Sequence, residues 1–155
     1  MSMRLVNAQL VHMEMIMVKV LVPVDGSENS IRVARNVVKL AGESIVPLDI
    51  HLLNVQHPLP GTIKGVAEQA KLFHNEQSHA ALAGAQKILD DAGVKHTDHM
   101  AVGEVDTVVV HLVDELKCDQ VIMGTRGMNS IANMVLGSVA TKVLHLVQVP
   151  VTLIK

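Results

Sequence analysis

Short apolar runs rich in valine and isoleucine alternate with segments of helical spacing along most of this chain. The runs are 18–24, 48–55, 94–102, 121–123 and 149–154. The helical segments are 31–41, 81–92, 105–116 and 139–147, where apolar residues recur three and four positions apart. Gly42 and Gly93 stand where the first two helices are expected to end. This alternation predicts right-handed βαβ units, and therefore an α/β fold whose five-stranded parallel sheet has helices on both faces.

Two of the runs have the character of edge strands. The run 94–102 carries too many charged and polar residues for the centre of a sheet that is covered on both faces. The run 149–154 contains Pro150, which has no N–H to donate and so favours an edge. We therefore expect the strand order 3-2-1-4-5. The last run is otherwise apolar, and pairing with its own copy in a homodimer would cover an edge that is prone to aggregate.

Composition limits the functions open to this chain. Its 155 residues suit one domain, placed at 17–155 after an N-terminal extension, 1–16, that lacks the pattern of an export signal. One Phe and no Trp or Tyr exclude aromatic cages and base-stacking surfaces. The net charge of −2 argues against a nucleic-acid binder, and the lone Cys118 fits a reducing compartment. We expect a cytoplasmic protein that binds neither nucleic acid nor membrane.

The segment between the fourth strand and the fourth helix carries the strongest chemical signal. It contains Gly124, Gly127 and Gly137, and it is longer than the usual connection of about 2–6 residues. Because Gly137 and Ser138 open the helix, its N–H groups and positive dipole end would face an anion, most often a phosphate. Arg126 adds a positive charge. The same residues also fit a long loop with a serine cap, and spacing alone leaves both interpretations open.

Asp25 follows the first strand at the carboxyl edge of the expected sheet. In open α/β sheets, ligands bind beyond the carboxyl ends, where the strand order reverses. Asp25 can therefore accept a hydrogen bond from an adenine amino group, a ribose hydroxyl or a metal-bound water. Asp25-Gly-Ser27 is equally suited to cap the following helix, and the two roles are compatible.

Several other chemical signatures are missing from the sequence. It has no G-x-x-x-x-G-K-[ST], and no G-x-G-x-x-G follows the first strand, which argues against a P-loop and a dinucleotide fingerprint. The nine histidines show no metal-ligand spacing, since His96 and His99 fall on opposite faces of a strand. His57, beyond the second strand, fits a solvated loop better than a ligand contact.

The chain resembles the universal stress protein family from about Met17 to Lys155. The matching segments are K-V-L-V-P-V-D-G-S at 19–27, L-L-N-V at 52–55, V-I-M-G at 121–124 and V-P-V-T-L-I at 149–154. The most specific match is G-x2-G-x9-G-S, which begins at Gly124 and ends at Ser138. That motif is typical of the ATP-binding branch of the family.

The resemblance implies a Rossmann-like α/β fold, a homodimer through 149–154 and a bound ATP, AMP or ADP, with or without Mg²⁺. It also implies a set of nucleotide-binding residues that surround the base, ribose and phosphates. These residues are Pro23, Val24, Asp25, Val55, Met123, Gly124, Arg126, Gly127, Gly137, Ser138, Val139 and Thr141.

The first functional hypothesis is a regulatory dimer in the stress response, in which nucleotide occupancy alters the binding of an unspecified partner. A role as an enzyme is less favoured, because no general base or acidic pair is evident near Ser138. The alternatives are a slow ATPase or phosphotransferase with Asp25 holding Mg²⁺, and a dimeric scaffold without nucleotide. A receiver domain fits poorly, since it expects a phosphoacceptor Asp where Val102 and Gly103 stand.

Overall fold

A computed structural model describes residues 16–59, 67–127 and 136–155 of the chain. Its strands are β1 (Val18–Pro23), β2 (Leu48–Gln56), β3 (His96–Val102), β4 (Gln120–Gly124) and β5 (Val151–Ile154). Its helices are α1 (Glu28–Glu43), α2 (Ala67–Asp91), α3 (Val105–Leu116) and α4 (Ser138–Leu146). Apart from the exposed Ile16, the expected N-terminal extension lies outside the described residues.

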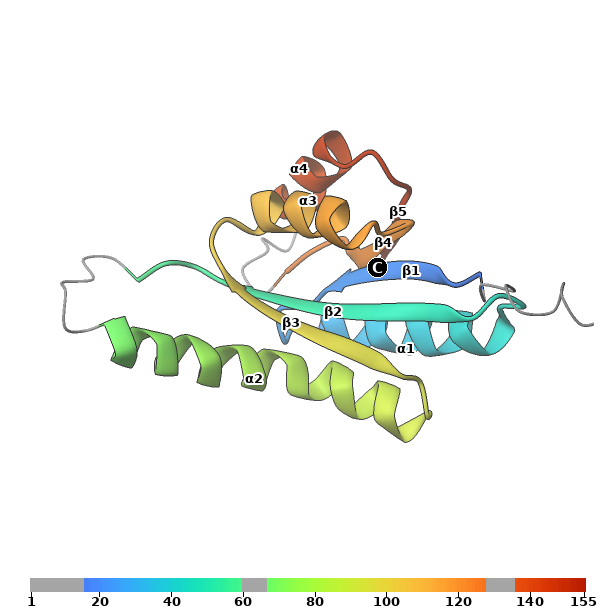
Figure 1. Ribbon diagram of the computed structural model, residues 1–155, viewed down its shortest axis with the longest axis horizontal. Coiled ribbons are helices and arrows are strands. Elements are labelled where there is room, and N and C mark those ends of the chain that lie inside the picture. Colours follow the sequence, from blue (N-terminus) through green and yellow to red (C-terminus); the bar gives the residue numbers. More distant parts are fainter. Residues whose placement is uncertain (1–15, 60–66, 128–135) are drawn as a thin grey trace, which may run out of the picture.

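The five strands form one parallel sheet in the order β3-β2-β1-β4-β5, which confirms the predicted fold class and strand order. β1 lies at the centre, with Val20 level with Ile50 of β2 and Gln120 of β4. In Figure 1, α1 and α2 lie on one side of the sheet and α3 and α4 on the other. The carboxyl ends of all the strands therefore meet at one edge of the sheet.

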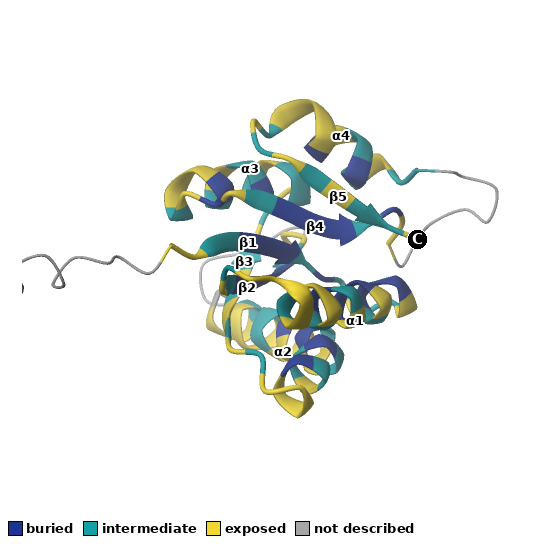
Figure 2. Cartoon of the chain, turned by 90° about the vertical axis from the view of Figure 1, so that its right-hand side faces the viewer, coloured by how far each residue is buried: buried dark blue, intermediate teal, exposed yellow. Residues whose placement is uncertain are grey.

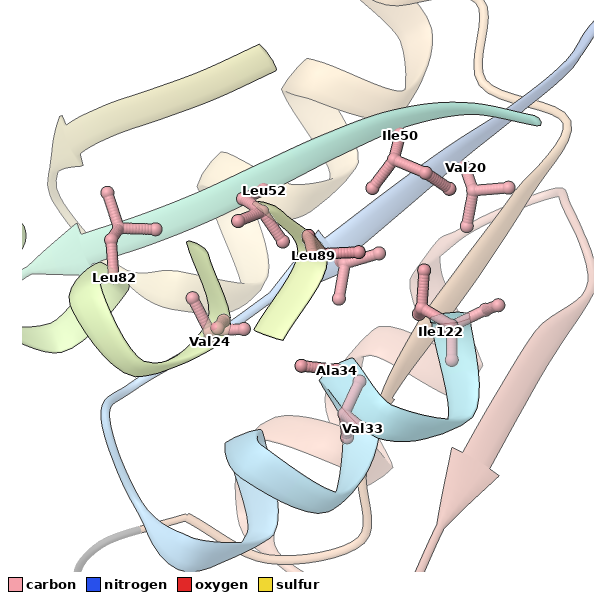
Figure 3. Close-up of a cluster of buried hydrophobic side chains, with 12 residues drawn as sticks. Val20, Val24, Val33, Ala34, Ile50, Leu52, Leu82, Leu89 and Ile122 are labelled. Atoms are coloured by element: carbon pink, nitrogen blue, oxygen red, sulfur yellow. The ribbon is translucent and has the colours of Figure 1, made fainter. Parts of the chain in front are cut away.

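The core has two halves that meet at the sheet. Val20 and Val22 of β1 are fully buried against α1 and α2, in the cluster drawn in Figure 3. Leu21, between them, faces the other way and packs with residues of α3 and α4. Because successive strand residues point to opposite faces, a strand between two helical layers must be apolar at every position. The fully buried Leu21, Val20 and Val22 satisfy that requirement.

Both outer strands match the edge positions expected from the sequence. β3 pairs with β2 alone and β5 with β4 alone among the described residues. Figure 2 shows buried residues concentrated in the inner strands and exposed residues on the outer surfaces of the helices. β5 is shorter than predicted: Pro150 precedes it, and the Pro150 carbonyl accepts a hydrogen bond from Val121 N at 2.9 Å.

Two helix boundaries differ from the sequence prediction. α1 continues past Gly42 to Glu43 and is capped by Ser44, whose N–H donates to the Leu40 carbonyl, so Gly42 is not the residue that ends it. α2 begins at Ala67 and not near residue 81. The sequence prediction missed the first half of this helix because that half is polar and lacks the apolar stripe that marks a helix. Gly93 does follow the end of α2, with a φ of 68°. No helix in the described ranges has both the length and the apolar character needed to span a bilayer.

Cys118 follows the left-handed residue Lys117 at the end of α3 and is buried among the residues that pack on α3 and α4. Burial raises the pKa of its thiol, so the neutral form is favoured. Cys118 therefore packs as a neutral thiol at the end of α3.

Two histidines meet on the face of the sheet that carries α3. His51 Nδ1 lies 2.8 Å from His99 Nε2, and His51 Nε2 lies 3.2 Å from a carboxylate oxygen of Asp49. Burial and the neighbouring His51 ring lower the pKa of His99, while the charges of Asp98 and Glu115 act in the opposite direction. An N–H···N hydrogen bond between the rings requires one of the facing nitrogens to be unprotonated.

We predict that this pair makes the folded state less stable in mild acid. Because the pKa of His99 is lowered from its ordinary value of 6.5, the unfolded chain binds a proton more readily. The stabilisation is fully present above that value and is lost as the pH falls below it. Since His99 is partly exposed, we expect a loss of less than about 1 kcal/mol. Urea unfolding between about pH 7 and 5 should give a shallower pH dependence for His99→Gln than for wild type.

His79→Gln is the control, because His79 is exposed on α2 and outside the pair. That variant should keep the wild-type pH dependence. An unchanged slope in His99→Gln would mean that other groups cause the pH dependence.

Candidate functional site

An open cleft of about 700 Å³ lies at the carboxyl edge of the sheet, within the usual range of about 300–1,000 Å³ for ligand sites. The ends of β1, β2 and β4, one side of α2 and the start of α4 all contribute to its lining. The cleft thus occupies the place where β1 and β4 lead to connections on opposite faces of the sheet, as expected for ligand sites in open α/β folds.

The structure brings nearly all the residues implied by the family resemblance into this one lining. Thr141 is the exception, because its Oγ1 donates to the Gly137 carbonyl at 3.0 Å within α4. The implied residues that do line the cleft are Pro23, Val24, Asp25, Val55, Met123, Gly124, Arg126, Gly127, Gly137, Ser138 and Val139.

Asp25 lies in the lining and also organises the start of α1. Its Oδ1 accepts hydrogen bonds from Ser27 N at 3.0 Å and from Ser30 Oγ at 2.7 Å. Ser27 is the cap residue of α1, and its hydroxyl accepts from Ser30 N at 3.3 Å. Asp25 therefore supports the cap from two positions before the cap residue Ser27 and still presents its carboxyl group at the cleft.

Two hydrogen-bonded side-chain amides, those of Asn54 and Gln56, support the base of the cleft. Asn54 is almost fully buried, and its Nδ2 donates to the Val24 carbonyl at 2.9 Å. Its Oδ1 accepts from Gln56 Nε2 at 2.7 Å. These bonds satisfy a buried polar side chain that stands between Leu53 and Val55, and they hold the residue after β1 against β2. Beside them, Val24 and Val55 give the cleft an apolar wall.

The glycines of the segment after β4 leave room for neighbouring groups. A β-carbon at Gly127 would lie 2.6 Å from Asp25 Oδ2, and one at Gly124 would collide with the side-chain amide of Asn29. A β-carbon at Gly137 would lie 3.2 Å from the Thr125 carbonyl oxygen. Each glycine thus allows a contact that a side chain would obstruct.

Backbone hydrogen bonds hold the two ends of this segment together. Gly137 N donates to the Thr125 carbonyl at 2.7 Å, and Thr125 N donates to the Ile154 carbonyl at 2.9 Å. The peptide groups of Thr125 thereby connect the start of α4 to the end of β5. Gly137 therefore lies beside Thr125 and Arg126 at the cleft.

The N-terminus of α4 opens onto the cleft. Gly137, and not Ser138, is the cap residue, and its carbonyl accepts from Thr141 N. Gly137, Ser138, Val139 and Ala140 all line the cleft. The positive end of the helix dipole and the exposed Arg126 make this end of the cleft suitable for an anion.

Sequence reasoning missed the wall of the cleft that α2 supplies. Gln77, Ala80 and Ala81 of α2 line it, together with Val105 at the start of α3. Gly26, with a φ of 81°, lets α2 approach, because a β-carbon there would lie 3.1 Å from Ala81 Cα. Nothing in the sequence of Gln77, Ala80 and Ala81 points to this contact, because these residues are small or polar and their placement at the cleft depends on how α2 packs.

Asn54 and His57 also lie at the cleft, although neither was assigned to the site from the sequence. Asn54 could have been noticed as a polar residue between Leu53 and Val55, where a buried amide needs a hydrogen-bond partner. His57 does line the cleft, although it is exposed. Among the described residues, no group of three or more His, Cys, Asp or Glu side chains is arranged to hold a metal ion.

Comparisons with known proteins identify the family and agree with the fold. The model of the universal stress protein family matches residues 17–155. Universal stress protein MJ0531 of Methanocaldococcus jannaschii is 27% identical over 143 residues, which are 88% of this chain and 81% of that protein. The solved structure of hypothetical protein MJ0577 has a TM-score of 0.72 at 27% identity, covering 89% of this chain and 95% of its own.

A second solved structure is a universal stress protein in complex with cAMP. It has a TM-score of 0.68 at 23% identity and covers 89% of this chain and 97% of its own. At that level of identity, the likeness shows that the two chains share a fold.

We predict that Gly127→Ala destabilises the chain, whereas Gly42→Ala does not. A methyl group at Gly127 would displace the Asp25 carboxyl group, which is held by Ser27 and Ser30. Losing part of that cap should lower the free energy of unfolding by about 1–2 kcal/mol. At Gly42, near the end of α1, no atom lies within 4 Å of an added β-carbon, so alanine should be neutral or stabilise by up to about 1 kcal/mol. Urea denaturation of both variants checks this, and equal stabilities would contradict it.

Proposed function

Because this chain belongs to the universal stress protein family, we propose that it binds an adenine nucleotide in the cleft at the carboxyl edge of its sheet. The observation that carries the proposal is the convergence of the glycine-containing segment and the N-terminus of α4 on one cleft. The similar protein that was solved with cAMP supports it, since cAMP is an adenine nucleotide.

The phosphates of the nucleotide would lie at the α4 end of the cleft. The backbone at Ser138, Val139 and Ala140 lines that end, where first-turn N–H groups lack acceptors within the helix. Ser138 adds a hydroxyl group, and Arg126, at the other end of the glycine-containing segment along the chain, adds a positive charge. Backbone donors and one cation suit a group with several negative oxygens.

The base would lie at the apolar end, where Val24, Val55 and Met123 line the cleft. The chain's one aromatic residue, Phe73, is exposed on α2 and does not belong to the lining. The base would therefore pack between aliphatic side chains and be read by hydrogen bonds. Asp25 is placed to accept a hydrogen bond from a ribose hydroxyl, because its carboxyl group lies beside Gly127 between the two ends.

The proposed nucleotide is ATP or AMP, with a regulatory role: occupancy of the cleft alters the binding of a protein partner in the stress response. Asp25 is the acidic side chain of the described lining, and its Oδ1 is engaged with α1. If Mg²⁺ accompanies the phosphates, Asp25 is the residue that would meet its water shell. The backbone-rich environment suits binding and orientation of phosphate better than proton transfer to or from a water.

We expect the purified protein to bind ATP or AMP and to lose this binding in Gly137→Val. A valine at 137 would press on the Thr125 carbonyl and separate the described ends of the segment. Isothermal titration calorimetry should show binding to wild type and none to the variant. Heating the protein as purified and testing the supernatant should also release an adenine nucleotide.

Gly42→Val is the matched control, because an added β-carbon there meets nothing within 4 Å and Gly42 lies outside the cleft. It should bind like wild type. A silent titration of wild type, together with no nucleotide in the extract, would overturn the proposed function.

The regulatory form we propose is a homodimer that pairs through β5. The Pro150 carbonyl accepts a hydrogen bond from Val121 N in β4, and the Ile154 carbonyl accepts one from Thr125 N directly after β4. Since alternate strand residues direct their backbone groups to opposite sides, Val151 and Leu153 present theirs at the outer edge. A second copy related by a two-fold axis would satisfy these groups and cover the half-buried apolar side chains.

Sedimentation velocity at micromolar concentration should show a dimer that Thr152→Lys weakens. Thr152 is exposed in the middle of β5, so lysine would place like charges on both paired strands. Thr107→Lys, an exposed position on α3, supplies the same charge away from the edge and should remain a dimer. A monomeric wild type would exclude this assembly.

A further inference from the structure

Asn29 on α1 is a buried polar residue that the nucleotide site as described does not use. It is only 6% exposed, and it lies in the first turn of the helix and outside the lining of the cleft. Burying a polar side chain without hydrogen bonds is unfavourable, so Asn29 is expected to have specific hydrogen-bond partners.

Both ends of the Asn29 amide are engaged. Its Nδ2 donates to the Arg126 carbonyl at 2.9 Å and packs against Gly124, where a β-carbon would collide with it. Its Oδ1 accepts from Nε and Nη2 of Arg32, each at 3.3 Å. Because the guanidinium group can only donate, it fixes which end of the amide faces Arg126.

These contacts complete the support of the two residues that begin the glycine-containing segment. The backbone of Thr125 is held by Ile154 of β5 and by Gly137 at the start of α4. Asn29 holds the next carbonyl, that of Arg126, from α1. Thr125 and Arg126 are thus hydrogen-bonded to residues of β5, of α1 and at the start of α4, and the bond from α1 is made by the Asn29 side chain.

We propose that Asn29 is a positioning residue for the phosphate end of the cleft, acting through Arg126 and Gly127. This inference rests on the proposed nucleotide binding and adds to it a residue outside the lining. By fixing the Arg126 carbonyl, Asn29 sets the direction in which the peptide of Gly127 and the Arg126 side chain leave β4. Its hydrogen bonds to described residues are with Arg126 and Arg32, neither of which belongs to the apolar end of the lining, where the base would lie.

The test compares the binding of ATP with that of adenosine, which has no phosphate. Asn29→Ala removes the amide, and Asn29→Asp places an oxygen that cannot donate against the Arg126 carbonyl. Loss of one such hydrogen bond should weaken ATP binding about three- to tenfold. The affinity of both variants for adenosine should stay within about twofold of the wild-type affinity, because the base and ribose would lie away from the lost hydrogen bond.

Asn36→Ala is the matched control. Asn36 lies on the same helix, and its amide donates to the Arg32 carbonyl at 3.1 Å without reaching the segment after β4. It should change neither affinity. Arg32→Gln tests the inference without touching the buried amide, because Arg32 is exposed and acts through Asn29. It should weaken ATP binding alone, and by less than Asn29→Ala does.

The outcomes separate this inference from the proposed function. A wild type that binds neither ATP nor adenosine would overturn both. A wild type that binds ATP, with Asn29 variants that bind it equally well or that lose ATP and adenosine in parallel, would overturn the positioning role alone. If the Asn29 variants do not fold, an Arg32→Gln variant with unchanged ATP binding does the same.

Discussion

Burial of β1 between two layers of helices is the constraint on which the structure depends. Val20, Leu21 and Val22 are fully buried on alternate faces, so neither face of the sheet can be left to solvent. With helices needed on both sides, the connections from β1 and β4 leave the sheet in opposite directions. The space between those connections is the cleft, and it exists because the strand beneath it is apolar on both faces.

The cleft is built mainly from peptide groups and small residues. Thr125 joins α4 to β5 through its backbone, and glycines admit Asp25 and Asn29 where side chains would stand. Such a site loses little side-chain entropy when a ligand binds, since most of its groups are already fixed by the sheet and helices. Preorganised backbone is an alternative to the long cationic side chains by which other folds hold phosphate.

Much of this could be predicted, for identifiable reasons. α3 has a continuous apolar stripe and was predicted with the bounds that it has, and the polar character of β3 placed it at the edge. The cleft residues at or just after strand ends, such as Asp25 and Gly124, could be predicted because ligand sites in this fold lie at the carboxyl ends of strands. The first half of α2 could not be predicted, since it lacks an apolar stripe. The role of Asn29 could not be predicted either, because an exposed asparagine and a buried, hydrogen-bonded one look alike in sequence. The helix end at Gly42 was wrong, since α1 continues to Glu43 without a left-handed turn.

Phe73 lies exposed on α2, and the chain has no Trp or Tyr. A protein of this kind is almost transparent in the near ultraviolet. Any strong absorbance there must come from something the chain holds, and adenine absorbs strongly in that region. The lack of aromatic side chains means that the base would pack against aliphatic residues. It also means that the polypeptide itself absorbs very little there, so a nucleotide bound in the cleft would be visible in the absorption spectrum of the purified protein.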